Sequence, residues 1–352
     1  MTMHSLSDMP GGRILFVCDT GPTSAGSPLQ ACSRLCDALA STGLGPLMLR
    51  GWPHAPHESR HAAKVQEHPY PIYCSREVRA EAPLLALLEQ PSLAITLGND
   101  PVGLAQPLLE AGISCMAWIL DAEGLQSFAA GPLDRRLGLA AASSALAARL
   151  QVLMGRPVAT LVPPLPSVSR FGGGGDAVLM PTDRLIDGLQ RVLEMAQARP
   201  DYRFHVLSDA PGGAAMPACA SHAPANVTWV DKSSAPCNYR VAVLPALGSD
   251  LPWHTLAQCL AAGIPVLGST EPLLVETLRT PELLVSATAP LDAWLAPLDL
   301  LMRDDVAHAQ MRPVAAQHSR ALELPSPEAA QQCLQIAGRH LASTGHLLAG
   351  HL

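Results

Sequence analysis

Short apolar runs alternate with amphipathic stretches along almost the whole chain, and this pattern predicts alternating strands and helices. Residues 13–18 (RILFVC) and 46–50 (PLMLR) are largely apolar runs, which are typical of buried parallel strands. Between them, residues 28–42 carry apolar side chains at helical spacing and are followed by Gly43, which predicts an amphipathic helix that ends there. A strand, a helix and a strand in this order predict a right-handed βαβ unit.

The same alternation continues along the rest of the chain. Further strands are predicted at residues 72–74, 93–98, 113–120, 137–143, 158–162, 177–180, 203–209, 227–230, 240–244, 264–267 and 282–285. Helices are predicted at residues 77–89, 102–111, 145–154, 184–198, 252–262 and 291–302, with more helical sequence beyond. Repeated βα units of this kind predict an α/β fold on parallel sheets.

The composition changes near the middle of the chain. Residues 163–176 (PPLPSVSRFGGGGD) combine prolines with four consecutive glycines, which is typical of a linker. A chain of 352 residues is long enough for two domains. We therefore expect an N-terminal Rossmann-like domain at 1–165, a linker at 166–176 and a C-terminal Rossmann-like domain at 177–325. Residues 326–352 are predicted to form a helix that can pack back on the N-terminal domain.

Composition and charge exclude several classes of protein. The net charge of −7 argues against general nucleic-acid binding. The N-terminus lacks the charged and apolar regions of a signal peptide, and no apolar run reaches about 18 residues, so we expect no transmembrane helix. The nine cysteines form no CxxC pair and are interpreted as free thiols in a reducing cytoplasm. Four histidines fall within residues 52–68, but Pro53 and Pro56 interrupt their helical spacing, so a solvent-exposed loop is favoured over a metal site.

The richest candidate chemistry lies in residues 241–267 (VAVLPALGSDLPWHTLAQCLAAGIPVL). An apolar run predicts a strand, Ser249 and Asp250 are capping candidates in the loop that follows, and Pro252 suits the first turn of a helix. Polar groups therefore gather at the carboxyl end of a strand and at a helix N-terminus. Open α/β sheets bind ligands at such an edge, and helix N-termini favour anions, so we expect a ligand site here.

Residues 244–269 (LPALGSDLPWHTLAQCLAAGIPVLGS), followed by Glu276, resemble the donor-site motif LPS…E-x7-E-A-M-A-x-G-x-P-V-V-x-S of the family 4 glycosyltransferases. The resemblance covers nearly the whole chain, including the strand, turn and helix at 93–111 and the Asn-Val strand at 226–230. It implies the GT-B fold, an α/β architecture in which two Rossmann-like β/α/β domains face an interdomain cleft.

The resemblance also implies a donor site. In the family, the first carboxylate of the motif contacts the donor sugar and the second binds the ribose hydroxyls. Counting back from Gly263 places the first at Asp250 and the second at Gln258, with the seven-residue spacing intact. Gln258 keeps hydrogen-bonding capacity but lacks the charge. A helix N-cap for Asp250 and an exposed helix residue for Gln258 are the alternatives.

Other donor-side positions depart from the family pattern. Leu251 and Trp253, next to the first carboxylate position, are expected to line the donor site. The basic pair that the family places after the first strand of the second domain is reduced to Arg184. Lys232 and Arg240 are candidate substitutes.

Further positions are expected near the N-terminal domain's strand ends. Gly26 retains one glycine of the family's first loop, on the donor side, while Ala25 takes the position of the other. Asn99, Asp100 and Asp121 are the polar groups where the family often has a histidine, and we expect them on the acceptor side.

The resemblance implies a retaining, hexosyltransferase-type enzyme that moves a sugar from a UDP- or GDP-linked donor to a carbohydrate or lipid-linked acceptor. Its expected role is cell-surface polysaccharide or glycoconjugate synthesis in the cytoplasm, with peripheral contact at the inner face of the membrane. No cofactor or metal is expected. The missing carboxylate, lysine and histidine leave an alternative: a non-catalytic glycosyltransferase-like protein acting as a partner or regulatory subunit of an active glycosyltransferase. An epimerase or a phosphorylase of the same fold is a further alternative.

Overall fold

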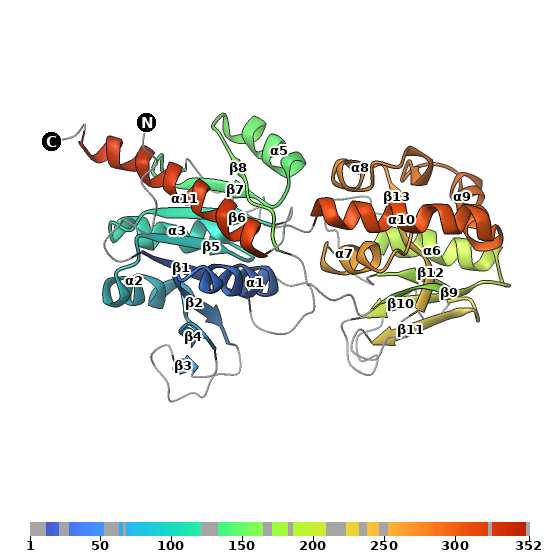
Figure 1. Cartoon of the computed structure of the whole chain (residues 1–352), viewed down its shortest axis with the longest axis horizontal. Helices are drawn as coiled ribbons and strands as arrows, with labels where there is room; N and C mark the ends of the chain where they lie inside the picture. Colours follow the sequence, from blue (N-terminus) through green and yellow to red (C-terminus); the bar gives the residue numbers. More distant parts are fainter. Residues whose placement is uncertain are drawn as a thin grey trace. The chain divides into compact units, whose positions relative to one another are not determined.

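The computed structural model describes residues 12–20, 28–52, 63–65, 68–120, 133–164, 171–181, 186–208, 223–231, 238–245, 253–322 and 326–349. The chain divides into two compact units (Figure 1). The first contains the described residues up to Pro164 together with 326–349. The second contains the described residues from 171 to 322.

The first unit is built on a sheet whose eight strands, counted over the described residues, lie in the order β3-β4-β2-β1-β5-β6-β7-β8. These strands are β1 (Arg13–Cys18), β2 (Gly45–Gly51), β3 (Ala63–Val65), β4 (Ile72–Ser75), β5 (Leu93–Leu97), β6 (Cys115–Ile119), β7 (Gly138–Ala141) and β8 (Ala159–Thr160). Only the β3–β4 pair is antiparallel among these neighbours. β3 lies in the polar stretch predicted as a loop, because a three-residue edge strand leaves too short a pattern to detect.

Helices cover both faces of this sheet. They are α1 (Pro28–Ser41), α2 (Val78–Glu89), α3 (Pro101–Glu110), α5 (Ser144–Met154) and α11 (Ser326–Ala349). α1 and α11 share one core with Ile14 and Phe16 of β1, whereas α2, α3 and α5 share another with Leu15 and Val17. Because successive strand side chains point to opposite faces, β1 is buried on both sides, and this explains its unbroken apolar run.

The C-terminal helix α11 belongs to the first unit. It packs against α1, and its Cys333 is fully buried in their shared core. The backbone amide of Val162 donates a hydrogen bond to Gln332 Oε1 at 3.1 Å. α11 therefore covers the α1 side of the sheet and contacts the segment just after β8.

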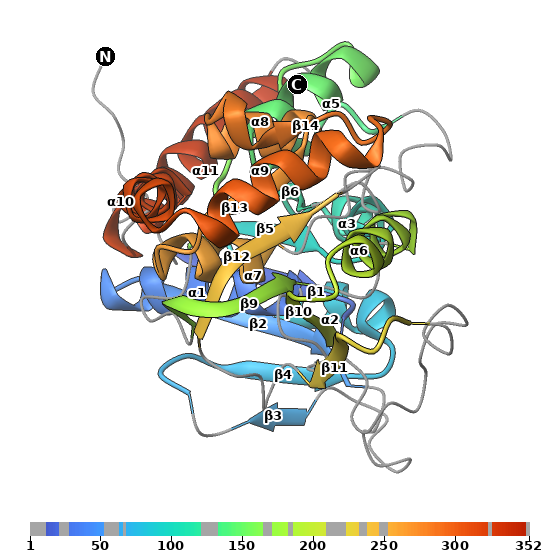
Figure 2. The ribbon, with the colours of Figure 1, turned by 90° about the vertical axis from the view of Figure 1, so that its right-hand side faces the viewer.

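The second unit is built on a parallel sheet with the order β11-β10-β9-β12-β13-β14 over the described residues. Its strands are β9 (Gly172–Met180), β10 (Arg203–Ser208), β11 (Val227–Asp231), β12 (Asn238–Leu244), β13 (Val266–Ser269) and β14 (Leu284–Val285). Figure 2 shows β9 between β10 and β12.

The helices of the second unit pack on one another and on the sheet. They are α6 (Ile186–Ala198), α7 (Trp253–Ala261), α8 (Pro272–Leu278), the 3₁₀ turn η5 (Pro281–Leu283), α9 (Leu291–Arg303) and α10 (Asp305–Leu322). α9 packs against α6 and β12, and α10 packs against α7 and α8. One hydrophobic core joins them to the sheet, with Trp294 of α9 fully buried in it.

The four glycines predicted as part of the 166–176 linker lie instead in β9. Their prediction as linker is wrong, since they form part of a strand. Glycine is needed at these positions because neighbouring backbone atoms pack too closely for a side chain. A Cβ on Gly175 would come within 3.0 Å of the Asn238 carbonyl oxygen in β12, and one on Gly173 would stand 2.8 Å from the Ala262 oxygen. Gly174 has a φ of 103°, which favours glycine.

Each unit is thus a sheet packed against helices, wholly parallel in the second unit and parallel in the first except for the edge strand β3. This arrangement confirms the predicted α/β fold of two Rossmann-like domains.

Candidate functional site

In the first domain, the winding direction reverses between β1 and β5. The chain leaves β1 towards β2 on one side, while β5 pairs with β1 on the other. Ligands in open α/β sheets bind outside the carboxyl ends of the strands at such a switch point. The residues that follow the two strands, Asp19 and 98–100, therefore form the candidate site of this domain.

The carboxylate of Asp19 binds two successive backbone amides of the loop after β5. Asn99 N donates to Asp19 Oδ1 at 2.9 Å, and Asp100 N donates to Oδ2 at 3.2 Å. Gly98 has a φ of 118°, and a Cβ there would come within 3.0 Å of Asp19 Oδ1. Burial raises the pKa of Asp19, and the hydrogen bonds from the two amides oppose that shift.

The structure brings Asn99 and Asp100, both predicted on the acceptor side, together at this switch point. Asp100 Oδ1 accepts a hydrogen bond from Gly103 N at 2.8 Å and so caps α3, which has Pro101 at its start. Asn99 is exposed to solvent. Sequence reasoning missed Asp19, although a carboxylate directly after the first apolar run was the available signal.

The second domain has its own switch point between β9 and β12. The chain continues from β9 to β10 on one side, while β12 pairs with β9 on the other. Val178 and Leu179 of β9 are in register with Val241 and Ala242 of β12. The two strands end side by side, and they lead into the segments that carry Arg184 and Asp250.

Gln258 lies on α7, the helix that follows β12, and it is 6% exposed. α7 packs against α10, which is distant in sequence. The alternative that Gln258 is an exposed helix residue is therefore wrong. For Trp253 the structure describes the backbone, which starts α7, and not the side chain.

Arg240, one of the two candidate substitute cations, has a structural role. Its Nε donates to the Leu301 carbonyl oxygen at 2.7 Å, and its Nη2 forms an ion pair with Asp305 Oδ1 at 2.7 Å. Arg240 also lies in the first half of β12, away from the strand's carboxyl end. Its guanidinium is bound to the end of α9 and the start of α10, which argues against a role in donor binding.

Six predicted site residues fall outside the described part of the chain: Gly26, Asp121, Arg184, Lys232, Asp250 and Leu251. Lys232 directly follows β11, the edge strand that β10 separates from β9.

Ser269 ends the donor-motif resemblance at 244–269, but sequence reasoning gave it no role of its own. It ends β13, which pairs with β12, and its side chain is fully buried. Its hydroxyl has no hydrogen-bond partner among the described residues. Buried hydroxyls normally have a hydrogen-bond partner, so the Ser269 hydroxyl is unusual. Because Ser269 ends its strand, it adds a polar group at the carboxyl edge of this sheet.

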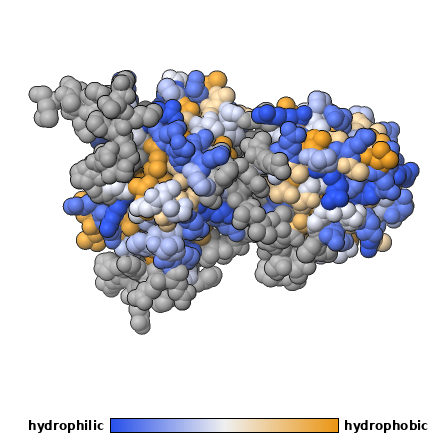
Figure 3. Space-filling view, in the orientation of Figure 1, coloured by the Kyte–Doolittle hydropathy of each residue, from blue (hydrophilic) through white to orange (hydrophobic). Residues whose placement is uncertain are grey.

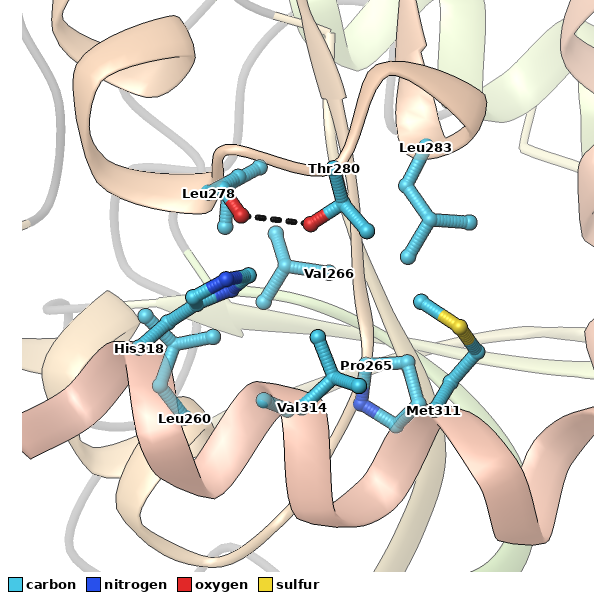
Figure 4. A pocket seen from close by; sticks show the side chains of 10 residues that line it. Leu260, Pro265, Val266, Leu278, Thr280, Leu283, Met311, Val314 and His318 are labelled. Carbon is cyan, nitrogen blue, oxygen red and sulfur yellow. Dashed lines mark hydrogen bonds between the residues drawn. The ribbon is translucent and has the colours of Figure 1, made fainter.

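A small hollow lies at the other end of β13, where Pro265 and Val266 line it (Figure 4). Its polar groups are the Thr280 hydroxyl, which donates to the Leu278 carbonyl oxygen, and the His318 imidazole. Burial, with a smaller effect of Arg279, lowers the pKa of His318. Because the hollow is at the amino end of the strand, it does not belong to the switch-point site.

Two further features concern metals and membranes. Within the described ranges, no group of three His, Cys, Asp or Glu side chains could hold a metal ion. None of the helices described for this chain is both long and apolar enough to cross a membrane.

No protein-family model and no curated protein matches the chain. Solved structures do resemble it. AviGT4, a glycosyltransferase involved in avilamycin A biosynthesis, aligns with a TM-score of 0.58 and 12% identity over 94% of this chain and 98% of its own. The E. coli trehalose-6-phosphate protein bound with UDP-2-fluoro glucose aligns with a TM-score of 0.61 and 11% identity over 93% of this chain and 99% of its own. A putative UDP-N-acetylglucosamine 2-epimerase from Listeria monocytogenes aligns with a TM-score of 0.54 and 10% identity over 92% of this chain and 94% of its own.

At these identities the likeness shows the fold alone. The chain has the two-domain α/β fold of GT-B glycosyltransferases, and the same fold is present in the protein described as an epimerase. Because one fold can support several chemistries, function has to be argued from the site.

Proposed function

We propose that the protein is a glycosyltransferase that moves a sugar from a nucleotide diphosphate-sugar to a carbohydrate or lipid-linked acceptor. The observation that carries this proposal is the pairing of β9 with β12 at the second domain's switch point. These strands lead into the segments that hold Arg184 and Asp250, two of the charged residues expected on the donor side. The GT-B fold and the resemblance to the family 4 motif support the same activity.

In this proposal the second domain binds the donor. Asp250 contacts the donor sugar, and Gln258 binds the ribose hydroxyls from its buried position on α7. Arg184 offsets the charge of the diphosphate, together with the N-terminus of α7 and Lys232. Leu251 and Trp253 line the sugar and the nucleotide.

The first domain contributes the acceptor side. Asn99 and Asp100 at its switch point, with Asp121 after β6, supply hydrogen bonds to acceptor hydroxyls, and Gly26 lets the backbone approach the donor. The transfer retains anomeric configuration and needs no cofactor, with a UDP- or GDP-linked hexose as donor. The biological setting is cell-surface polysaccharide or glycoconjugate synthesis at the cytoplasmic face of a membrane.

Calorimetric titration of the protein with a panel of UDP- and GDP-sugars tests donor binding directly. A nucleotide-release assay with carbohydrate and lipid-linked acceptors then tests turnover. Asp250→Ala should abolish turnover, whereas Asp292→Ala should not, because Asp292 is an exposed carboxylate in the first turn of α9.

The outcomes separate the competing functions. Failure to bind any donor would remove the glycosyltransferase proposal. Donor binding without nucleotide release, with every acceptor class, would favour a non-catalytic partner subunit. Release of nucleotide that Asp250→Ala leaves unchanged would remove Asp250 from the site. Conversion of the donor sugar without transfer would favour an epimerase.

A further inference from the structure

Asp19 is held in place from two sides by glycine. Gly51, the last residue of β2, packs against the Asp19 backbone so closely that a Cβ on it would approach within 3.0 Å of the Asp19 carbonyl oxygen. Gly98, directly after β5, lies against the Asp19 carboxylate, and a Cβ on Gly98 would occupy the space that the carboxylate fills. The carboxylate therefore lies between the ends of neighbouring strands with little freedom to move.

The loop after β5 depends on that carboxylate. Both oxygens of Asp19 accept hydrogen bonds from the amides of Asn99 and Asp100, at 2.9 Å and 3.2 Å. Asp100 is fixed a second time because its own carboxylate caps α3 through Gly103 N. Two successive amides around an anion form a concave backbone nest, and here the anion is supplied by the chain itself.

Fixing the backbone on both sides leaves the Asn99 side chain as the exposed polar group of this turn. An amide offers an oxygen acceptor and two N–H donors, which suits a pair of sugar hydroxyls. A ligand-contacting residue needs a backbone that does not move, since small misplacements can cost about a hundredfold in rate.

We infer that Asp19 is a positioning residue for the acceptor side: its carboxylate holds the Asn99–Asp100 turn so that Asn99 meets the hydroxyls of a carbohydrate acceptor. This inference rests on the proposed function, and it adds a residue that contacts no substrate itself. Asp19 acts through the backbone amide of Asn99, so the effects of changing the two residues should be coupled.

A double-mutant cycle tests that coupling. Turnover at varied acceptor concentration is measured for the wild type, Asp19→Asn, Asn99→Ala and the double variant. We expect each single change to lower kcat/KM for the acceptor by about tenfold to a hundredfold, and the double variant to be no worse than Asn99→Ala. The Kd for the donor, measured by calorimetry, should stay within about twofold because the donor binds to the other domain.

Asp134→Asn is the matched control. Asp134 also accepts a hydrogen bond from a backbone amide, that of Arg136 at 2.8 Å. It precedes β7, however, and therefore lies at the amino ends of the strands, whereas Asp19 lies at their carboxyl ends. Its replacement should leave kcat/KM unchanged. Multiplicative losses in the cycle, or a loss of donor affinity in Asp19→Asn equal to the loss of turnover, would overturn the inference.

Hydrogen exchange of the Asn99 and Asp100 amides gives a readout that does not need turnover. In Asp19→Asn these two amides should exchange faster than in the wild type. If Asp19→Asn is too unstable to study, Gly98→Ala takes its place, and the same faster exchange is expected. Unchanged protection in both variants would overturn the inference. A wild type that turns over no donor would count against the proposed function alone, and the exchange result would still decide the role of Asp19.

Discussion

Gly175 in β9 lies directly against Asn238 in β12, with no room between them for a side chain. A Cβ on Gly175 would approach the Asn238 carbonyl oxygen and the Tyr239 nitrogen to within 3.0 Å. At this place the register between the two strands shifts, between Tyr239 and Val241. Because β9 and β12 flank the second domain's switch point, the glycine helps set the register in which both strands reach it.

Gly175→Ala should therefore destabilise the second domain. The added methyl group meets backbone atoms, which cannot rotate away as a side chain can, so we expect a loss of about 2 kcal/mol in the free energy of unfolding. Gly338→Ala is the control, since a Cβ there has nothing within 4 Å. In the middle of α11 it should stabilise by about 0.5–1 kcal/mol. Denaturant unfolding measures both, and equal stability of the two variants would contradict the packing argument.

Much of the fold could be predicted from the sequence because parallel strands and amphipathic helices leave strong local patterns. Residues 13–18 were predicted as a strand, and β1 spans Arg13–Cys18. Burial on both faces makes the five positions after Arg13 apolar, and no distant information is needed to find such a strand.

The features that sequence reasoning missed depend on distant contacts. The glycines of β9 read as a linker because their reason, the backbone of Asn238, lies far along the chain. The position of Asp19 after the first apolar run was a weak signal on its own, because its partner Asn99 is 80 positions away. Gln258 is buried in a domain whose α10 packs against α7, and the periodicity of α7 alone does not reveal that helix.

Asp299→Asn should lower stability at neutral pH but not at acidic pH. Arg199 donates to both oxygens of Asp299, with Nη2 to Oδ2 at 2.6 Å, and this lowers the pKa of Asp299. A carboxylate with a lowered folded-state pKa stabilises above its unfolded pKa, and the contribution is lost as pH falls through the folded value. We expect a cost of about 1 kcal/mol at pH 7. Unfolding curves from pH 7 to pH 2 should converge for the variant and wild type, and curves that stay parallel would exclude this ion pair as the cause.

Protonation of His340 should weaken the docking of α11 on the first domain. The His340 ring lies against Gly138, where a Cβ would stand 2.8 Å from Nδ1. Burial lowers the pKa of His340, a hydrogen bond with the Cys115 backbone partly opposes that shift, and Arg156 adds a smaller effect that lowers it. Because the unfolded chain binds the proton more readily, stability falls as pH drops below about 6.5 and levels off under the folded pKa.

Hydrogen exchange of α11 between pH 7 and pH 5 measures that effect, after correction for the intrinsic rate. His340→Gln should reduce the pH dependence of α11 protection. His68→Gln, at an exposed position, should leave it unchanged. Equal pH dependence in wild type and His340→Gln would assign the effect to another group.

Gln258→Glu should tighten donor binding and destabilise the donor-free protein. If Gln258 binds the ribose, a carboxylate would accept from its hydroxyls more strongly than the amide does, and we expect Kd to fall about tenfold. Gln258 is 6% exposed, so the new charge also carries a desolvation cost that lowers the free energy of unfolding. Calorimetric titration and denaturant unfolding measure the two effects.

Gln258→Leu, similar in volume but without polar atoms, should weaken donor binding. Gln190→Glu, on the exposed surface of α6, should change neither donor affinity nor stability. Equal donor affinity in wild type, Gln258→Glu and Gln258→Leu would remove Gln258 from the ribose site.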